Sequence, residues 1–373
     1  MGRDRRSLAL AWLAIATLTT VLIVGNAREA IRRYRALDSG WSWDLAYYNQ
    51  WFWSLTQGDG RITVRPVASY GQEDPSIWRS NYLAPIRLAI ALIYALRPGP
   101  ETLLVVEAVL LWMVVPAAFV LARGESGSVF LGLASACLVP LTPLLVPIAA
   151  NDFRELQLAI PFVVLAVEGM RGRRRWMASA GIAGMLACRQ EYAVLVASLG
   201  LIPPRQPEDL GRTARWFRAS FYAGVAWWLV FLLYLGVARG YGTVAAYLGQ
   251  FTGETPPLEA ALPAAGEIIL LGLGAWSAML VGLPRMWLVV FPWAWCVVRA
   301  GGTIGVVGTG YWSGVRYMAP LAGIGIAAGL VGLCRAARLI DLPGSRLVAI
   351  SGRLGILAVA ALGLFAARSA MHS

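Results

Sequence analysis

The chain is predicted to be an all-α membrane protein that crosses the bilayer many times. Apolar residues make up 58% of its 373 residues and charged residues only 14%, and the mean hydropathy is +0.63. Apolar runs of about 20 residues, the length that crosses a bilayer, recur from one terminus to the other. We therefore expect residues 1–373 to form a single membrane-embedded domain in a lipid bilayer.

About 11 apolar runs read as transmembrane helices on length and composition. A twelfth run, over 82–96, is short and bracketed by Pro85 and Pro98, so we expect it to be re-entrant or interfacial. Between the first span and this run lies a large loop, over 27–80, that we expect to carry an amphipathic helix. The predicted spans are 8–26, 101–122, 128–149, 156–170, 176–188, 191–202, 217–238, 263–283, 286–300, 317–334 and 347–367.

Arginine clusters predict which loops face the cytoplasm. The clusters lie over 171–175, 205–218 and 335–346. If all three are cytoplasmic, 176–202 must enter the membrane and return as a hairpin that turns at 188–191. The N-terminus is then cytoplasmic, and the 27–80 loop lies on the outer side.

One group of arginines conflicts with this arrangement. Arg28, Arg32, Arg33 and Arg35 follow the first span, on the predicted outer side. Either later helices dominate the orientation of the chain, or these arginines attract lipid phosphates at the membrane surface.

The charged and metal-binding residue types exclude several classes of function. The net charge is +12 without any lysine, but the arginines lie in short, scattered loops, so no nucleic-acid surface is expected. The four cysteines have no metal-ligand spacing, and the only histidine is His372. We therefore expect no histidine-based catalysis and no cysteine or histidine metal site.

The segment 41–53 contains seven aromatic residues and a single carboxylate, Asp44. Positions 47, 48, 51 and 55 would form one face of a helix that lies in the membrane interface. Asp44 would then meet a lipid-linked substrate as a catalytic base. The alternative is an aromatic belt with Asp44 as the helix N-cap.

Four further polar segments are predicted on the same side of the membrane as Asp44. They lie at 79–82, 152–155, 189–192 and 311–317. Together with the Asp44 segment they could form one polar pocket at the bilayer surface. The alternative is that their charges form structural ion pairs within the loops.

The order of these segments resembles an uncharacterised family of predicted bacterial membrane proteins that is grouped with the GT-C glycosyltransferases. The family pattern resembles YDLGIFDQALWSL, HFSP, DFHP, R-E-[DE] and HYxxPLLP. The matching segments here begin at Asp44, Asn81, Asn151, Arg189 and Arg316. This chain has Asn81, Arg154 and Arg316 at positions where the family tends to have histidine, and Glu155 where it has proline.

The resemblance implies a GT-C-like helical bundle with interfacial helices in the first outer loop. It also implies transfer of a sugar from a polyprenyl-phosphate donor to an extracytoplasmic acceptor at a bacterial inner membrane. Catalytic roles would fall to Asp44, Asp152 and Glu191, with Asp44 as general base. A divalent cation held by these carboxylates is optional and is not predicted. Substrate-binding roles would fall to Gln50, Asn81, Arg154, Arg189, Arg316 and Tyr317.

Two other functions stay open from the sequence. An inactive GT-C-like scaffold that binds lipid would explain the missing histidines. A lipid or solute transporter would place charges at mid-membrane, where Glu107 and Glu168 are candidates.

Overall fold

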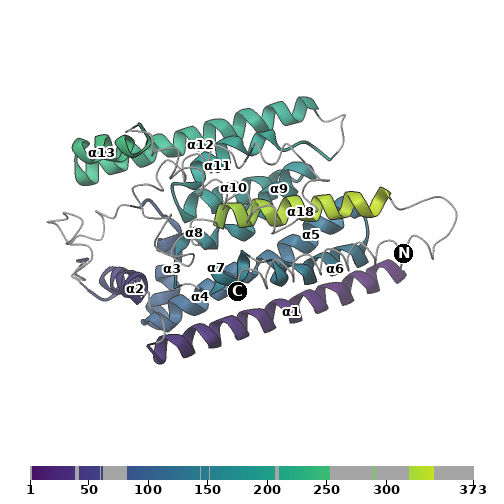
Figure 1. The fold of residues 1–373 in the computed structure, drawn as a ribbon, viewed down its shortest axis with the longest axis horizontal. Helices are drawn as coiled ribbons and strands as arrows, with labels where there is room; N and C mark the ends of the chain where they lie inside the picture. The colour runs from purple at the N-terminus through teal and green to yellow at the C-terminus, as the bar shows by residue number, and fades with distance from the viewer. Residues whose placement is uncertain are drawn as a thin grey trace, which may run out of the picture.

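The computed structural model describes residues 2–37, 42–58, 60–61, 82–142, 144–150, 152–205, 210–252, 289 and 319–339. Most of these residues lie in helices (Figure 1). The helices are α1 (Gly2–Arg35), α2 (Ser42–Thr56), α3 (Ile86–Leu96), α4 (Pro100–Trp112), α5 (Val114–Ser126), α6 (Val129–Leu138), α7 (Leu145–Ala149), α8 (Glu155–Leu158), α9 (Ile160–Arg171), α10 (Arg175–Cys188), α11 (Tyr192–Ser198), α12 (Leu210–Arg239), α13 (Tyr241–Thr252) and α18 (Ala319–Leu339), with short 3₁₀ turns η3 (Val139–Leu141) and η4 (Leu199–Leu201).

Four helical stretches in the described part of the chain are long and apolar enough to cross a membrane: Arg5–Arg35, Pro100–Ser126, Arg215–Ala238 and Ala319–Arg338. The predicted spans at 128–149, 156–170, 176–188 and 191–202 are present as shorter helices. The predicted spans at 263–283, 286–300 and 347–367 lie outside the described residues, apart from residue 289. An all-helical membrane protein is thus confirmed, and the full number of spans stays a prediction.

The first helix is longer than predicted. It continues from Gly2 to Arg35 and so includes the four arginines that we assigned to the 27–80 loop. At about 1.5 Å per residue, α1 is about 51 Å long, well beyond the hydrocarbon thickness of a bilayer. The arginine-bearing end therefore extends past the apolar span as helix, and the predicted loop begins later than residue 27.

The helices run back and forth between two ends of the bundle (Figure 1). One end contains α2, the start of α3 and the 189–191 turn, and is called the α2 end below. The other contains the end of α5, the α9–α10 turn and the C-terminal end of α18, and is called the arginine-rich end. Residues 176–202 form two helices, α10 and α11, joined by a turn at 189–191, and their entry into the membrane as a hairpin stays a prediction.

Glycines allow helices within the bundle to approach closely. A Cβ atom on Gly169 would lie 2.1 Å from the backbone nitrogen of Ala178, and one on Gly181 would lie 2.5 Å from that of Ala166. Small residues at such crossings let backbones pack directly, which is how helices associate inside membranes. The α9–α10 pair therefore sets a fixed distance between the 152–155 and 189–191 segments.

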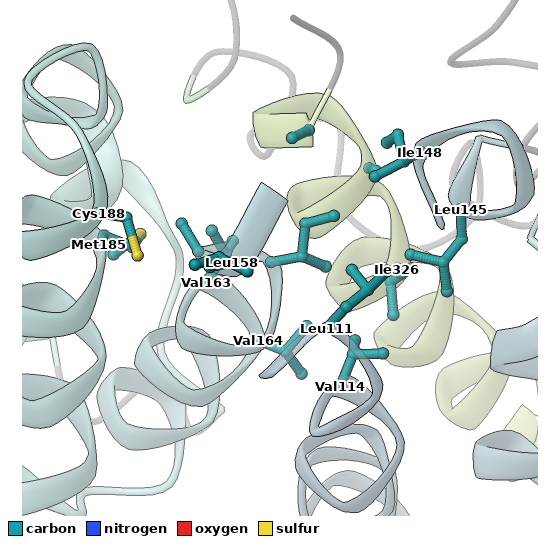
Figure 2. Close-up of a cluster of buried hydrophobic side chains, with 14 of the residues drawn as sticks. Leu111, Val114, Leu145, Ile148, Leu158, Val163, Val164, Met185, Cys188 and Ile326 are labelled. Carbon is teal, nitrogen blue, oxygen red and sulfur yellow. The ribbon is translucent and has the colours of Figure 1, made fainter. Parts of the chain in front are cut away.

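The centre of the bundle is apolar and is organised around α18. Leu111, Val114, Leu145, Val164 and Ile326 are completely buried there (Figure 2). They come from α4, α5, α7, α9 and α18, so segments far apart in sequence share one core. By contrast, only 17% of the apolar window of α1 and 22% of that of α12 are buried, as expected for helices that face lipid.

The predicted helix after Asp44 is present as α2, but its apolar face differs from our prediction. Leu45, Tyr48, Trp51 and Phe52 are all at most 4% exposed. Phe52 stacks on Tyr94 of α3 with ring centroids 5.5 Å apart. The aromatic face of α2 thus packs against protein, because Tyr94 of α3 and Phe153, just before α8, supply rings that compete with the membrane interface.

The short run at 82–96 forms α3, which has 11 residues. At about 16 Å it is too short to cross a bilayer, and its re-entrant or interfacial position stays a prediction.

Candidate functional site

The first predicted catalytic residue, Asp44, pairs with an arginine from a distant segment. Asp44 lies in the first turn of α2, and its carboxylate forms an ion pair with Arg154, just before α8. The Asp44 side chain is 33% exposed, whereas that of Arg154 is 9% exposed. Since α2 begins at Ser42, Asp44 is inside the helix and is not its N-cap. The Asp44 carboxylate is thus accessible from outside, while the arginine that pairs with it is buried.

A fully buried cluster lies directly beneath this pair. Glu155 accepts a hydrogen bond from the Tyr48 hydroxyl at 2.6 Å and forms an ion pair with Arg87 of α3. The Arg87 guanidinium also lies over the rings of Tyr48 and Trp51, 5.2 and 5.1 Å from their centroids. This cluster joins α2, α3 and α8, and so fixes the position of Asp44.

The charge of Glu155 depends on its neighbours. Burial by itself would raise the pKa of this carboxyl, but Arg87, Arg189 and the Tyr48 hydrogen bond outweigh it and lower the pKa overall. Burial and the negative charge of Glu155 raise the pKa of Tyr48 well above its usual value. The cluster therefore contains an ionised glutamate and a neutral tyrosine that donates its proton to the hydrogen bond.

The α10–α11 turn brings the next predicted residues to the same end. Arg189 is buried and lies over the Tyr82 ring, 3.8 Å from its centroid. Its Nε donates to Glu191 at 3.0 Å, and the Glu191 side chain is 30% exposed. The neighbouring Gln190 accepts a hydrogen bond from the Leu83 backbone at 3.1 Å. The 82–83 and 189–191 segments are thereby joined.

Asp152 has a different environment from Asp44. It precedes α8, and one of its carboxylate oxygens is buried without a hydrogen-bond partner. Burial raises its pKa to about 6, and the nearby Arg33 opposes this rise. Glu107 of α4, which is 4% exposed, lies within electrostatic range of both Asp152 and Arg33. Asp152 is therefore a carboxyl that titrates close to neutral pH.

Four of the five segments predicted to converge are at least partly described, and their described parts meet at the α2 end. Gln50 lies half-buried in α2. Asn81, Arg316 and Tyr317 lie outside the described residues, so their predicted roles stay predictions. The Arg189–Glu191 pair agrees with the alternative of a local ion pair, while Asp44–Arg154 connects two segments.

Sequence reasoning missed Arg87, placed Tyr48 only on the apolar face of a helix, and treated Glu155 only as a departure from the family pattern. A charge inside the short apolar run at 82–96 was the available signal for Arg87. The pairing partner of that charge, 68 residues away in the chain, could not be read from spacing.

Within the described part of the chain, no three histidine, cysteine, aspartate or glutamate side chains come together as a metal site. The optional divalent cation therefore has no assigned ligands here. Arginine partners already occupy the carboxylates of Asp44, Glu155 and Glu191.

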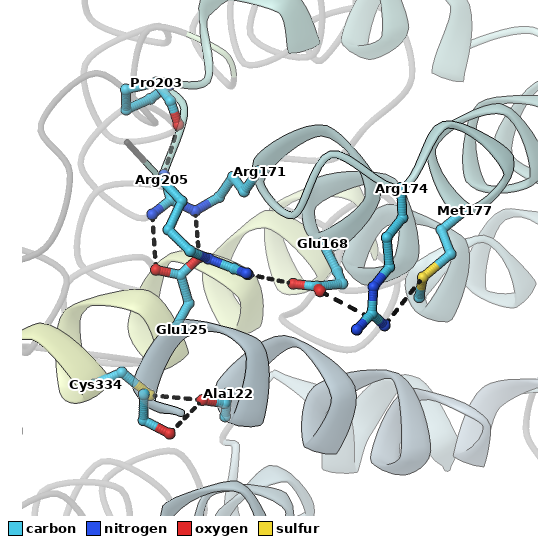
Figure 3. A network of polar contacts seen from close by, with 10 residues as sticks. Ala122, Glu125, Glu168, Arg171, Arg174, Met177, Pro203, Arg205 and Cys334 are labelled. Carbon is cyan, nitrogen blue, oxygen red and sulfur yellow. Dashed lines mark hydrogen bonds and ion pairs between the residues drawn. The ribbon is translucent and has the colours of Figure 1, made fainter. Parts of the chain in front are cut away.

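A second ionic network lies at the arginine-rich end (Figure 3). Both Glu125 oxygens accept from Arg171 at 2.8 Å, and Arg205 reaches Glu125 at 2.9 Å and Glu168 at 2.7 Å. Arg171 also donates to the Pro203 carbonyl at 2.6 Å. Glu168, which we considered for mid-membrane, is thus at a bundle end. These contacts tie α5, α9 and the segment after η4 together.

Residues 33–243 match a family described as predicted membrane proteins, DUF2079. The match includes both networks and every described site residue named above. No curated protein matches the chain. The matched region is more than half of the 373 residues, and the chain therefore belongs to the predicted membrane protein family DUF2079.

Proposed function

We propose that this protein is a GT-C-type glycosyltransferase of the bacterial inner membrane. It would transfer a sugar from a polyprenyl-phosphate donor to an acceptor hydroxyl on the extracytoplasmic side. The observation that carries the proposal is the Asp44–Arg154 pair, in which a partly exposed carboxylate sits on a buried arginine. An acid in the first outer segment is also what the resemblance to GT-C enzymes implies.

The pair supplies the two groups that the reaction needs. Asp44 would accept the proton of the acceptor hydroxyl as its oxygen forms a bond to the anomeric carbon. The bond between that carbon and the phosphate oxygen would break, and polyprenyl phosphate would leave with the electron pair. An arginine suits the phosphate oxygens because its planar fork donates two parallel hydrogen bonds.

Arg154 connects donor binding to activation of the base. In the free protein its guanidinium is paired with Asp44. A donor phosphate would compete for the same guanidinium and so leave Asp44 free to take a proton. The buried Glu155–Arg87 pair beneath would keep α2 in place during this exchange, because it does not depend on the substrate.

Asp152 is a second candidate for the base. Its pKa of about 6 is close to working pH, which favours acid–base catalysis. Arg33 and Glu107 are both within electrostatic range of Asp152. Comparing variants of Asp44 and Asp152 therefore decides which carboxyl takes the proton.

The test is turnover of polyprenyl-phosphate sugars by the purified protein, measured as release of polyprenyl phosphate. We expect activity in the wild type, none in Asp44→Asn, and full activity in Glu101→Gln. Glu101 is a matched control, because it is also a carboxylate paired with an arginine, Arg35 at 2.8 Å, at the same end. Loss in Asp152→Asn instead of Asp44→Asn would reassign the base. Binding without turnover in the wild type would indicate an inactive scaffold.

One observation favours transport as the alternative function. Glu107 is buried in a stretch long enough to span the membrane, and one of its oxygens has no hydrogen-bond partner. Buried carboxylates of this kind are used by transporters to carry protons or cations. Uptake of a lipid or solute into vesicles that depends on Glu107, without release of polyprenyl phosphate, would support this alternative.

A further inference from the structure

The turn between α9 and α10 has an unusual concentration of exposed cations. Arg173, Arg174 and Arg175 are all exposed, and they are followed by Trp176, which is 70% exposed. An exposed indole next to arginines is typical of the boundary between membrane and water, where its apolar body enters the headgroup region.

The backbone of this turn places an arginine where glycine is favoured. Arg173 has φ of 60°, in the left-handed region that side chains with a Cβ atom rarely adopt. The preceding residue, Gly172, has little room for a side chain, because its Cβ would lie 2.7 Å from Glu168 Oε1 and 2.9 Å from the Glu168 backbone oxygen. A costly conformation that is kept at an exposed charged residue suggests a function for that charge.

The network below the turn neutralises only part of the positive charge. Glu125 and Glu168 are shared among Arg171, Arg205 and the more distant Arg174, which is 4.0 Å from Glu168. Arg335 of α18 lies within electrostatic range of Arg171 and Arg338 as well as Glu125. Among the described residues, cations thus outnumber carboxylates here, and an anion would relieve their mutual repulsion.

We propose that Arg173, Arg174, Arg175 and Trp176 form a binding site for the headgroup phosphate of an anionic phospholipid. The helical spans that end at Ser126 and Arg338 place this end at a membrane boundary, where such phosphates lie. Arginine provides forked donors to phosphate oxygens, and Trp176 would lie against the upper acyl chain. This site is separate from the proposed sugar-transfer site, which is at the α2 end.

The test measures lipid binding to the purified full-length protein in neutral detergent, by native mass spectrometry with added phosphatidylglycerol or phosphatidylcholine. We expect the wild type to retain phosphatidylglycerol preferentially. Each arginine near a membrane surface contributes about a fivefold change in affinity, so Arg173→Gly with Arg175→Gln should weaken phosphatidylglycerol binding about 25-fold. The control, Arg97→Gln, removes an exposed arginine at the α2 end and should change nothing.

Arg173→Gly separates lipid binding from folding. It relieves the left-handed backbone, so the single variant should melt at the same or a higher temperature while it binds phosphatidylglycerol about fivefold more weakly. Equal binding by the wild type and the double variant would overturn the proposal. So would displacement of the lipid by millimolar inorganic phosphate, because the site would then recognise the free anion.

Discussion

The two ends of the helical bundle use the same residue types in opposite ways. At the α2 end, Asp44, Glu155 and Glu191 each pair with one arginine, and the side chains of Asp44 and Glu191 are about one-third exposed. At the arginine-rich end, the side chains of Glu125 and Glu168 are 4% and 0% exposed, and arginines surround them. Two of the paired carboxylates at the α2 end are thus partly exposed, whereas both carboxylates at the arginine-rich end are buried.

This difference separates a candidate reaction site from a structural network. A carboxylate that accepts a proton must be reachable by substrate, and only the α2 end meets that condition among the described residues. Buried carboxylates shared among several arginines instead hold elements together. The following predictions test this division.

The largest effect on stability is expected for Glu155→Ala. This change leaves Arg87, whose side chain is 3% exposed, without its carboxylate. Removing one member of a buried ion pair typically costs about 3–5 kcal/mol. Chemical unfolding in mixed micelles should therefore show a large loss, and Glu29→Gln, whose ion pair with Arg32 joins two exposed side chains, should show a small one. Equal losses in the two variants would contradict the role of Glu155 as the buried anchor of α2.

A slightly smaller loss is expected for Glu125→Gln at the opposite end. We expect about 2–4 kcal/mol, because Arg205 keeps Glu168 and Arg171 keeps the Pro203 carbonyl. Sugar transfer per folded molecule should stay at the wild-type level, whereas Asp44→Asn should abolish transfer with little change in stability. A Glu125 variant that folds normally but is inactive would contradict the assignment of the reaction site to the α2 end alone.

Asp152 predicts a dependence of stability on pH. Its pKa in the folded protein is about 6, above the ordinary value of 3.8, so the folded state binds the proton more tightly than the unfolded state. The contribution of Asp152 to the free energy of unfolding is therefore fully present below about pH 4. It is lost as the pH rises through about 6.

The variant Asp152→Asn removes that loss. The difference between the two pKa values corresponds to about 3 kcal/mol, and partial exposure reduces it to about 1–2 kcal/mol. Melting curves should show the variant more stable than the wild type at pH 8 and equal to it at pH 4. A difference that does not change with pH would show that the carboxyl is not the cause.

The smallest effect is expected for Arg32→Gln on α1. Its ion pair with Glu29 at 2.7 Å joins side chains that are more than half exposed, and such pairs contribute little. The melting temperature should not change measurably. A clear decrease would show that this end of α1 is covered by another part of the protein.

Much of the architecture follows from sequence patterns. Apolar run length predicted α12 and α18, the flanking prolines predicted that α3 is short, and the polar residues at 188–191 predicted the break between α10 and α11. The end of α1 was missed because its last turns are polar, and a helix can continue into water where its polar face needs no partner. The buried face of α2 was missed because membrane interface and protein interior both accept aromatic rings.

The sequence by itself determined that this is a helical membrane protein, and it identified the polar segments that are unusual in one. Both follow from the sequence because the burial of apolar runs and the cost of placing charge in lipid act on each segment separately. Only the tertiary structure decided that Asp44 pairs with Arg154 and Arg87 with Glu155. Several arginines could satisfy each carboxylate equally well in charge. Which of them meet depends on how the fold brings α2 and α3 beside the 152–155 segment, a contact between segments far apart in the chain.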